Sequence, residues 1–399
     1  MTRLLFHSGS LFDGTGAPAG EADVVVADGR IVEVGSGLDG DEAVDCTGRT
    51  ILPGLFDCHV HVTSSGPDLL VRLNKPFSYP YFEAVVNLRR TLAAGITTVR
   101  DAGGADLGVK EAVDSGLVPG PRMKIAISIL SQTGGHSDGW MACGLDLTRA
   151  ATPGAPGPIV DGVEAARQKV RELIRAGADQ IKVCTSGGVL SPRDDPRHAQ
   201  FRLDELEEIV AEAAAGRTYV MAHAQATDGI KNAVRAGIRS IEHGVFLDEE
   251  AIEMMLASGT WLVPTLVAPV GVLEAAEAGA SMPPQMLQKA RDVIGVHRES
   301  IARAVAAGVK IAMGTDSGVG PHGQNLRELE LMRQAGMTPL EVLAATTSEP
   351  AKLLDVSEEL GTIEVGKRAD LVVVAGDPLE FTTLTERVEQ VWKDGVREI

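Results

Sequence analysis

The chain has 399 residues, of which 44% are hydrophobic and 23% are charged, a composition typical of a soluble globular protein with a sizeable core. A formal net charge of −18 and the lack of a basic run argue against a nucleic-acid partner, because nucleic-acid affinity depends on neutralising phosphates. The sequence has four scattered cysteines, no signal-peptide pattern and no long uncharged apolar stretch. We therefore expect a cytoplasmic protein without a membrane partner.

Both ends of the chain are predicted to form short β-strands. The first fifty residues contain alternating apolar runs separated by Asp-Gly turns at 13–14 and 28–29, a pattern typical of hairpins. Similar runs occur at 369–378 and 388–396. Because neither end has enough apolar surface to be stable alone, we expect the two ends to pair in one small β-domain.

The middle of the chain alternates apolar, β-branched runs with segments of helical periodicity. Helices are predicted at 163–177 and 203–216, where apolar positions recur at helical spacing and the segment closes with Gly. The eight candidate strands span residues 55–61, 97–101, 123–128, 180–184, 219–224, 240–244, 261–266 and 310–316. Parallel strands need such crossover helices, so the pattern predicts an α/β fold, a (β/α)8 TIM barrel over residues 55–355.

Polar residues lie at the carboxyl ends of five of these strands, where TIM barrels carry their active sites. Each alone has an ordinary explanation: a satisfied core histidine, a lysine in a salt bridge, or an aspartate that caps a helix or forms a turn. Six of them at matching positions are hard to explain in that way, and imidazole and carboxylate ligands suit Zn²⁺, Mn²⁺ or Co²⁺. The six candidates are His59, His61, Lys182, His223, His243 and Asp316.

Several motifs resemble the amidohydrolase superfamily over essentially the whole chain: D-C-H-V-H after I-L-P-G-L-F, the lysine on a strand, M-A-H-A, S-I-E-H-G and G-T-D. The two ends, residues 1–54 and 356–399, are similar to its composite β-sandwich. T-T-V-R-D-A-G-G, G-G-H and C-T-S-G-G-V-L-S-P resemble the prolidase-type, imidazolonepropionase-related branch. Members of that branch hydrolyse aminoacyl-proline or other dipeptides, or N-acyl amino acids such as ochratoxin A.

This resemblance implies a site with two divalent metal ions, zinc in the first place and manganese or cobalt as alternatives. His59, His61 and Asp316 would hold the more buried ion, and His223 and His243 the more exposed one. Lys182 would carry a carbamate derived from CO2 that bridges both ions. A metal-activated hydroxide would attack the amide, with Asp316 accepting its proton and delivering it to the leaving nitrogen.

Further residues are candidates for binding the substrate. His136 in G-G-H is expected to donate a hydrogen bond to the developing oxyanion, unless it is a loop histidine without a task. Arg193, Arg197 and His198 lie just after the fourth strand and would suit a substrate carboxylate, although a solvated loop with internal ion pairs explains them equally well. Gln225 stands where some prolidase-like relatives have a tyrosine, so the oxyanion contact is expected to differ.

The predicted activity is cleavage of the amide bond of a dipeptide, Xaa-Pro or with a hydrophobic C-terminal residue, or of an N-acyl amino acid. A lactonase or organophosphate hydrolase uses the same kind of site and stays an alternative. Mononuclear deaminases and imidazolonepropionase-like cyclic-amide hydrolases generally lack the strand-borne lysine, and a non-enzymatic scaffold would be expected to lose ligands. The expected partner is a small-molecule substrate, and a homo-oligomer is an expectation from the family alone.

Overall fold

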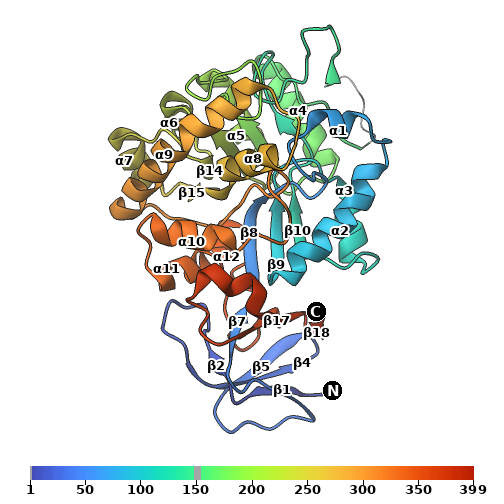
Figure 1. Ribbon diagram of the computed structural model, residues 1–399, viewed down its shortest axis with the longest axis vertical. Helices are drawn as coiled ribbons and strands as arrows, with labels where there is room; N and C mark the ends of the chain where they lie inside the picture. Colours follow the sequence, from blue (N-terminus) through green and yellow to red (C-terminus); the bar gives the residue numbers. More distant parts are fainter. Residues whose placement is uncertain (1, 148–153) are drawn as a thin grey trace.

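Strands from the two ends of the chain lie together in one β-rich part of the molecule (Figure 1). The computed structural model describes residues 2–147 and 154–399. One sheet has the order β5-β4-β1-β6, formed by Arg30–Gly35, Asp23–Ala27, Leu4–His7 and Glu42–Asp45. The other has the order β18-β17-β16-β7-β2-β3, formed by Val396–Arg397, Val388–Lys393, Leu371–Ala375, Arg49–Pro53, Ser10–Leu11 and Gly20–Glu21.

The second of these sheets joins the two ends of the chain directly. β16 pairs antiparallel with both β17 and β7, so that Val372 lies opposite Leu52. A buried apolar cluster fills the space between the two sheets, and within it the rings of Phe6 and Trp392 meet edge-on at 5.1 Å. The strands predicted at both ends are thus present, and the division at residues 54 and 356 into a separate domain stays a prediction.

The middle of the chain forms parallel strands with helices between them. The strands are β8 Leu55–Val60, β9 Ile96–Asp101, β10 Arg122–Ile125, β11 Ile129–Leu130, β12 Ile181–Cys184, β13 Val220–Ala224, β14 Ser240–His243 and β15 Trp261–Val263. They form two sheets, β10-β9-β8 and β11-β12-β13-β14-β15. The strand predicted at 123–128 is regular only as far as the end of β10, because Ile127 takes a φ of +66°, and β11 begins just beyond the predicted range. The α/β fold is therefore confirmed.

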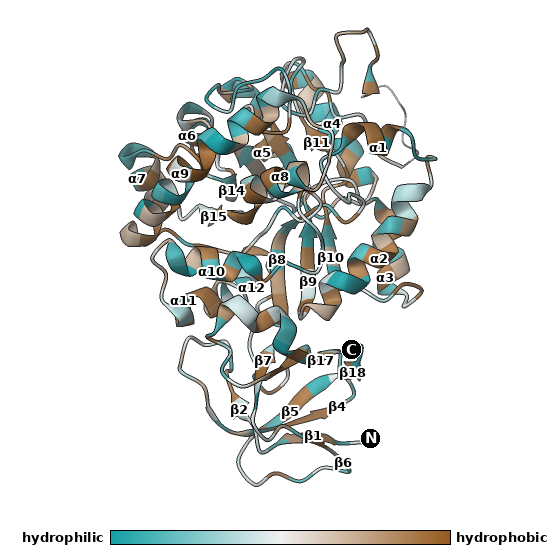
Figure 2. Cartoon of the chain, in the orientation of Figure 1, coloured by the Kyte–Doolittle hydropathy of each residue, from teal (hydrophilic) through white to brown (hydrophobic). Residues whose placement is uncertain are grey.

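Helices surround these strands, and their bounds include the two helices predicted from the sequence. The helices are α1 Leu69–Leu73, α2 Tyr79–Ala93, α3 Leu107–Asp114, α4 Val163–Arg175, α5 Leu203–Ala215, α6 Thr227–Ala236, α7 Glu249–Ser258, α8 Val267–Glu277, α9 Pro284–Ala307, α10 Arg327–Gln334, α11 Pro339–Ala344, α12 Ser348–Leu353 and the 3₁₀ helix η2 Phe381–Arg387. Helices such as α6 and α9 carry hydrophilic and hydrophobic residues side by side, as expected for helices that cover a core (Figure 2). None of the described helices is both long and apolar enough to cross a membrane.

The strand predicted at 310–316 is not a regular strand. The segment instead makes separate backbone contacts on two sides, an isolated bridge from Ile311 to Leu262 and another from Ser317 to Val60. Features of Gly314 and Asp316 explain why this segment does not form a regular strand. A Cβ at Gly314 would lie 2.4 Å from a side-chain atom of Val263, so this glycine allows close packing, and Asp316 has a φ of +60°, outside the extended region. The prediction of an extended strand here was wrong, and a closed barrel stays a prediction.

A buried carboxyl group fixes the start of α8. Glu328 in α10 is fully buried, and its two oxygens accept hydrogen bonds of 2.7 and 2.8 Å from the backbone N–H groups of Leu266 and Val267. Burial raises the pKa of Glu328 to about 8, although these two donors act in the opposite direction. The folded state therefore holds a proton on this group over a pH range in which the unfolded chain has lost it.

This difference predicts a pH-dependent stability. Below about pH 4.5 the carboxyl is protonated in both states, and as pH rises toward 8 only the unfolded state ionises, so the free energy of unfolding falls by up to about 1.4 kcal/mol per pH unit. Glu328→Gln removes this titration. Urea unfolding of both proteins between pH 5 and 8 should show the variant gaining stability relative to the wild type as pH rises. Parallel pH profiles would contradict the assignment.

Candidate metal centre

Three of the predicted ligands converge at the carboxyl end of β8. His59 is on the strand and is 1% exposed, His61 follows it, and Asp316 donates its backbone N–H to the carbonyl of His59 at 2.7 Å. One carboxylate oxygen of Asp316 lies 3.5 Å from His59 Nε2 and 3.1 Å from His61 Nε2. The ligand atoms of the three residues lie within 4.8 Å of one another, as a shared cation requires.

The hydrogen bonds of these two histidines determine which nitrogen is free. His59 Nδ1 lies 2.8 Å from a carboxylate oxygen of Glu242, and His61 Nδ1 lies 2.7 Å from the carbonyl oxygen of Gly103. Because both partners only accept, each Nδ1 carries the proton and each Nε2 presents a lone pair. In these tautomers both lone pairs face the carboxylate of Asp316, an arrangement that is typical of metal ligands.

The other two histidines have the same kind of support. His223 Nε2 lies 3.0 Å from the carbonyl oxygen of Gly187, and His243 Nδ1 lies 2.6 Å from the hydroxyl oxygen of Thr265. That hydroxyl donates its own proton to the carbonyl of Pro264, so it accepts from His243. The free lone pairs are thus Nδ1 of His223 and Nε2 of His243, whose ring centroids are 4.6 Å apart. Each histidine keeps one nitrogen for a ligand.

The backbone at this end of the strands is strained. His243, Thr265 and Asp316 have φ values of +74°, +51° and +60°, in a region that non-glycine residues rarely adopt. Such strain costs roughly 1–3 kcal/mol per residue and is found where side chains must be aimed precisely. Two of these three residues are predicted ligands, and the third holds the ring of a ligand.

Lys182 lies on β12 in the same buried region. Its Nζ is 3.2 Å from His59 Nε2, and the residue is 2% exposed. Burial lowers its pKa, and within the described part of the chain no carboxylate forms an ion pair with it. The surroundings therefore favour a neutral amine, since an unpaired buried ammonium is costly.

His136 lies directly beside this cluster. Its ring stacks on that of His223, with centroids 4.3 Å apart and planes at 17°, and its Nδ1 lies 2.8 Å from a carboxylate oxygen of Asp194. Burial alone would raise the pKa of Asp194, but the hydrogen bond from His136 and the charge of Lys289 lower it to about 2. Asp194 is thus ionised, and it leaves Nε2 of His136 available for other contacts.

Of the remaining residues predicted to bind the substrate, one is buried and three are exposed. Gln225 is 6% exposed, and its side-chain oxygen has no hydrogen-bond partner among the described residues, so a ligand that donates a proton would satisfy it. Arg193 stacks on the Trp140 ring and Arg197 on the Phe246 ring, at 4.8 and 5.0 Å from the ring centroids, and both are exposed, as is His198. Their role as ligands of a substrate carboxylate stays a prediction.

The sequence interpretation missed two residues that support the site. Glu242 and Arg100 are fully buried, and the guanidinium donates to Glu242 at 2.9 Å while the other carboxylate oxygen holds His59. Ser240 adds a hydrogen bond of 2.6 Å to the same carboxylate. A signal was present: both are charged residues within apolar predicted strands, the same feature that singled out Lys182.

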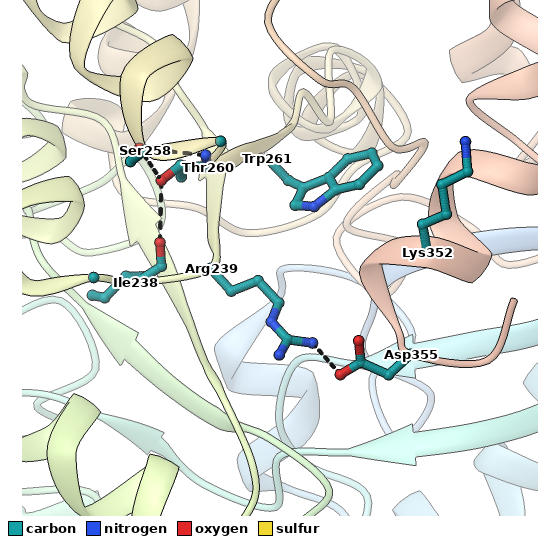
Figure 3. Close-up of a pocket in the computed structure, with 9 residues that line it drawn as sticks. Ile238, Arg239, Ser258, Thr260, Trp261, Lys352 and Asp355 are labelled. Carbon is teal, nitrogen blue, oxygen red and sulfur yellow. Dashed lines mark hydrogen bonds and ion pairs between the residues drawn. The ribbon is translucent and has the colours of Figure 1, made fainter.

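A shallow pocket of about 360 Å³ lies at the other end of the strands (Figure 3). Arg239, which directly precedes β14, and Trp261, the first residue of β15, line it. Arg239 is paired with Asp355, and Lys352 with Glu349. Because its basic side chains are already paired and it lies away from the carboxyl strand ends, this pocket does not compete with the histidine cluster as the candidate site.

Comparisons with known proteins agree with this geometry. The model of the Amidohydrolase family matches residues 50–397. The ochratoxinase of Aspergillus niger is 34% identical over 417 aligned positions, covering 98% of this chain and 85% of that protein. A prolidase solved with N-methylphosphonate-L-proline is 38% identical with a TM-score of 0.92, and a Xaa-Pro dipeptidase solved with methionine in its active site is 33% identical with a TM-score of 0.90; each covers 99% of both chains. The chain therefore belongs to the amidohydrolase family.

Proposed function

We propose that this hydrolase cleaves the amide bond of a dipeptide or an N-acyl amino acid, and that it does so with two divalent metal ions. The observation that carries the proposal is the set of four histidines, three buried and His61 half-buried, each with one nitrogen committed to an acceptor and the other free. The names of two similar proteins, a prolidase and a Xaa-Pro dipeptidase, indicate that those proteins cleave amide bonds of dipeptides.

The donor set fits two metal positions. His59, His61 and Asp316 would hold the more buried ion, and His223 and His243 the second. An uncharged lysine amine is the form that adds CO2, burial of Lys182 favours that form, and the resulting carbamate would give both ions an anionic ligand. Zinc is the first candidate, with manganese or cobalt as alternatives. When bound, such ions polarise a carbonyl and lower the pKa of water toward neutrality.

Other groups of the chain supply proton transfer and orientation. The carboxylate of Asp316, next to the free nitrogens of His59 and His61, would accept the proton of the attacking water and deliver it to the leaving amine nitrogen. Nε2 of His136 would donate a hydrogen bond to the oxygen of the scissile carbonyl, and the contact of Nδ1 with Asp194 would hold the ring in that orientation. Gln225 would contact the substrate through its unpaired oxygen.

We also propose the architecture that carries this site. Residues 55–355 would form a closed (β/α)8 barrel, in which the segment 310–317 lies between β15 and β8; its backbone contacts with Leu262 and Val60 support this closure. Residues 1–54 and 356–399 would form the composite β-sandwich, supported by the pairing of β7 with β16.

Metal analysis tests the two-ion proposal. Wild-type protein prepared without chelators should contain about two equivalents of metal per chain, and Lys182→Ala should lower this content because the shared ligand is lost. Lys124→Ala, which changes a half-buried lysine of β10, is the matched control and should leave the content unchanged. A wild-type protein with one equivalent would favour a cyclic-amide hydrolase, and one with none would contradict the proposal.

A substrate screen tests the bond and the substrate class. Dipeptides and N-acyl amino acids with varied C-terminal residues should be hydrolysed, with a preference that depends on that residue. Liquid chromatography of the released amino acid gives the measurement. Hydrolysis of lactones or phosphotriesters in the absence of any amide hydrolysis would instead favour the alternative activities.

His136→Ala tests the contact with the substrate oxygen. Loss of one donor to an oxyanion typically lowers kcat by about 10²–10³-fold, and we expect a decrease of this order with the metal content retained. His7→Ala, which removes a half-buried histidine of β1 in the sheet formed by the N-terminal segment, is the control and should retain activity. An unchanged kcat in His136→Ala would show that this ring does not contact the reacting group.

A further inference from the structure

A lysine on α9 holds the loop that follows β12. The ammonium group of Lys289 donates to the carbonyl oxygens of Gly188, Ser191 and Asp194 at 2.9, 2.7 and 2.5 Å. It also lies 3.2 Å from a carboxylate oxygen of Asp194, and its side chain is 16% exposed. These contacts use all the donors of the ammonium, so a single side chain fixes the position of several backbone groups of this loop.

The contacts continue from this lysine to His136. The carboxylate oxygen of Asp194 that does not face Lys289 accepts from His136 Nδ1 at 2.8 Å and from the backbone N–H of Gly188 at 3.1 Å. The Asp194 side chain is 4% exposed, so little water competes for it. The orientation of the His136 ring therefore depends on a carboxylate that the lysine holds in place.

The same loop also holds His223. Gly187 provides the carbonyl oxygen that accepts from His223 Nε2 at 3.0 Å. At Gly188 a Cβ would lie 2.4 Å from His136 Cε1 and 2.8 Å from His223 Cε1, so the loop backbone packs closely against both rings. A shift of this loop must therefore move both rings or release them.

We propose that Lys289 is a positioning residue for the active site. It acts through Asp194 and through Gly187–Gly188, and it sets the orientation of His136 and the ligand geometry of His223 without touching either ring. The inference rests on the proposed function, because His223 is assigned there to the second metal position.

The support of the other metal position is separate. His59 is held by Glu242, which is in turn held by Arg100 and Ser240, and Lys289 makes no described contact with these residues. Loss of the lysine should therefore weaken one metal position and leave the other unchanged. A general loss of structure would weaken both.

The test is a titration of metal-free protein with Co²⁺, followed through its visible spectrum, on wild type and on Lys289→Met, which keeps the apolar stem and removes the donors. The position at His223 and His243 has fewer protein ligands, so we expect it to bind the weaker equivalent of metal. In Lys289→Met the affinity for this equivalent should fall about 10-fold or more, the usual effect of removing a supporting group, while the affinity for the tighter equivalent is unchanged. With zinc-loaded protein and a dipeptide substrate, kcat should fall more than KM changes. Arg291→Met, which removes an exposed cation of the same helix, is the control and should behave as wild type.

The outcomes separate this inference from the proposed function. If wild type binds fewer than two equivalents, the two-ion proposal is wrong. If wild type binds two and Lys289→Met binds both as wild type does, or loses both equally, the inference is wrong. Should Lys289→Met fail to fold, Asp194→Asn keeps the size of the side chain and must show the same selective weakening, and equal binding in that variant overturns the inference.

Discussion

The site depends on one constraint, the commitment of one nitrogen of each of its four histidines, His59, His61, His223 and His243, to a fixed acceptor. A carboxylate, two backbone carbonyls and a hydroxyl whose own proton is already donated fill these positions. Because none of these partners gives a proton to the ring, the tautomer of each histidine follows, and four lone pairs remain for ligands. Without these acceptors the same rings would be free to rotate or to exchange tautomers.

The fold supplies these acceptors from outside the proposed set of metal ligands. Glu242 belongs to the strand next to that of His223, Thr265 follows β15, and Gly187 follows β12. Positive φ values at the ends of these strands turn the backbone so that ligands and acceptors meet. The irregular ends of the strands are thus part of how the site is built, and the regular interior of the strands provides the stable core around them.

Sequence patterns predicted the parts of the structure that depend on local periodicity. The helices at 163–177 and 203–216 are present as α4 and α5, and the strand positions of His59, Lys182, His223 and His243 follow from apolar runs. The irregular backbone at 310–316 was not predictable, because it follows from the packing of Gly314 against residues far away in the sequence.

The side-chain contacts within the site could not be predicted from the sequence, because they join segments that lie far apart in the chain. Arg100 and Glu242 are 142 positions apart, and nothing in either segment shows that the two charges are paired. Lys289 on α9 contacts Asp194, which lies 95 positions earlier in the chain. Its position in the sequence pattern of α9 is that of an ordinary half-buried lysine, so the pattern does not indicate this contact. Arg193 stacks on Trp140, a contact that nothing in its own segment indicates, and its role toward a substrate carboxylate stays a prediction.

The most direct test of this account is a crystal structure of chelator-free protein with diffraction data collected at the absorption edge of the metal. The account predicts two anomalous peaks, one among Nε2 of His59, Nε2 of His61 and Asp316, and one between Nδ1 of His223 and Nε2 of His243, together with a carbamate on Lys182 that contacts both. A bare amine at Lys182 and no anomalous peak beside the imidazoles would contradict it.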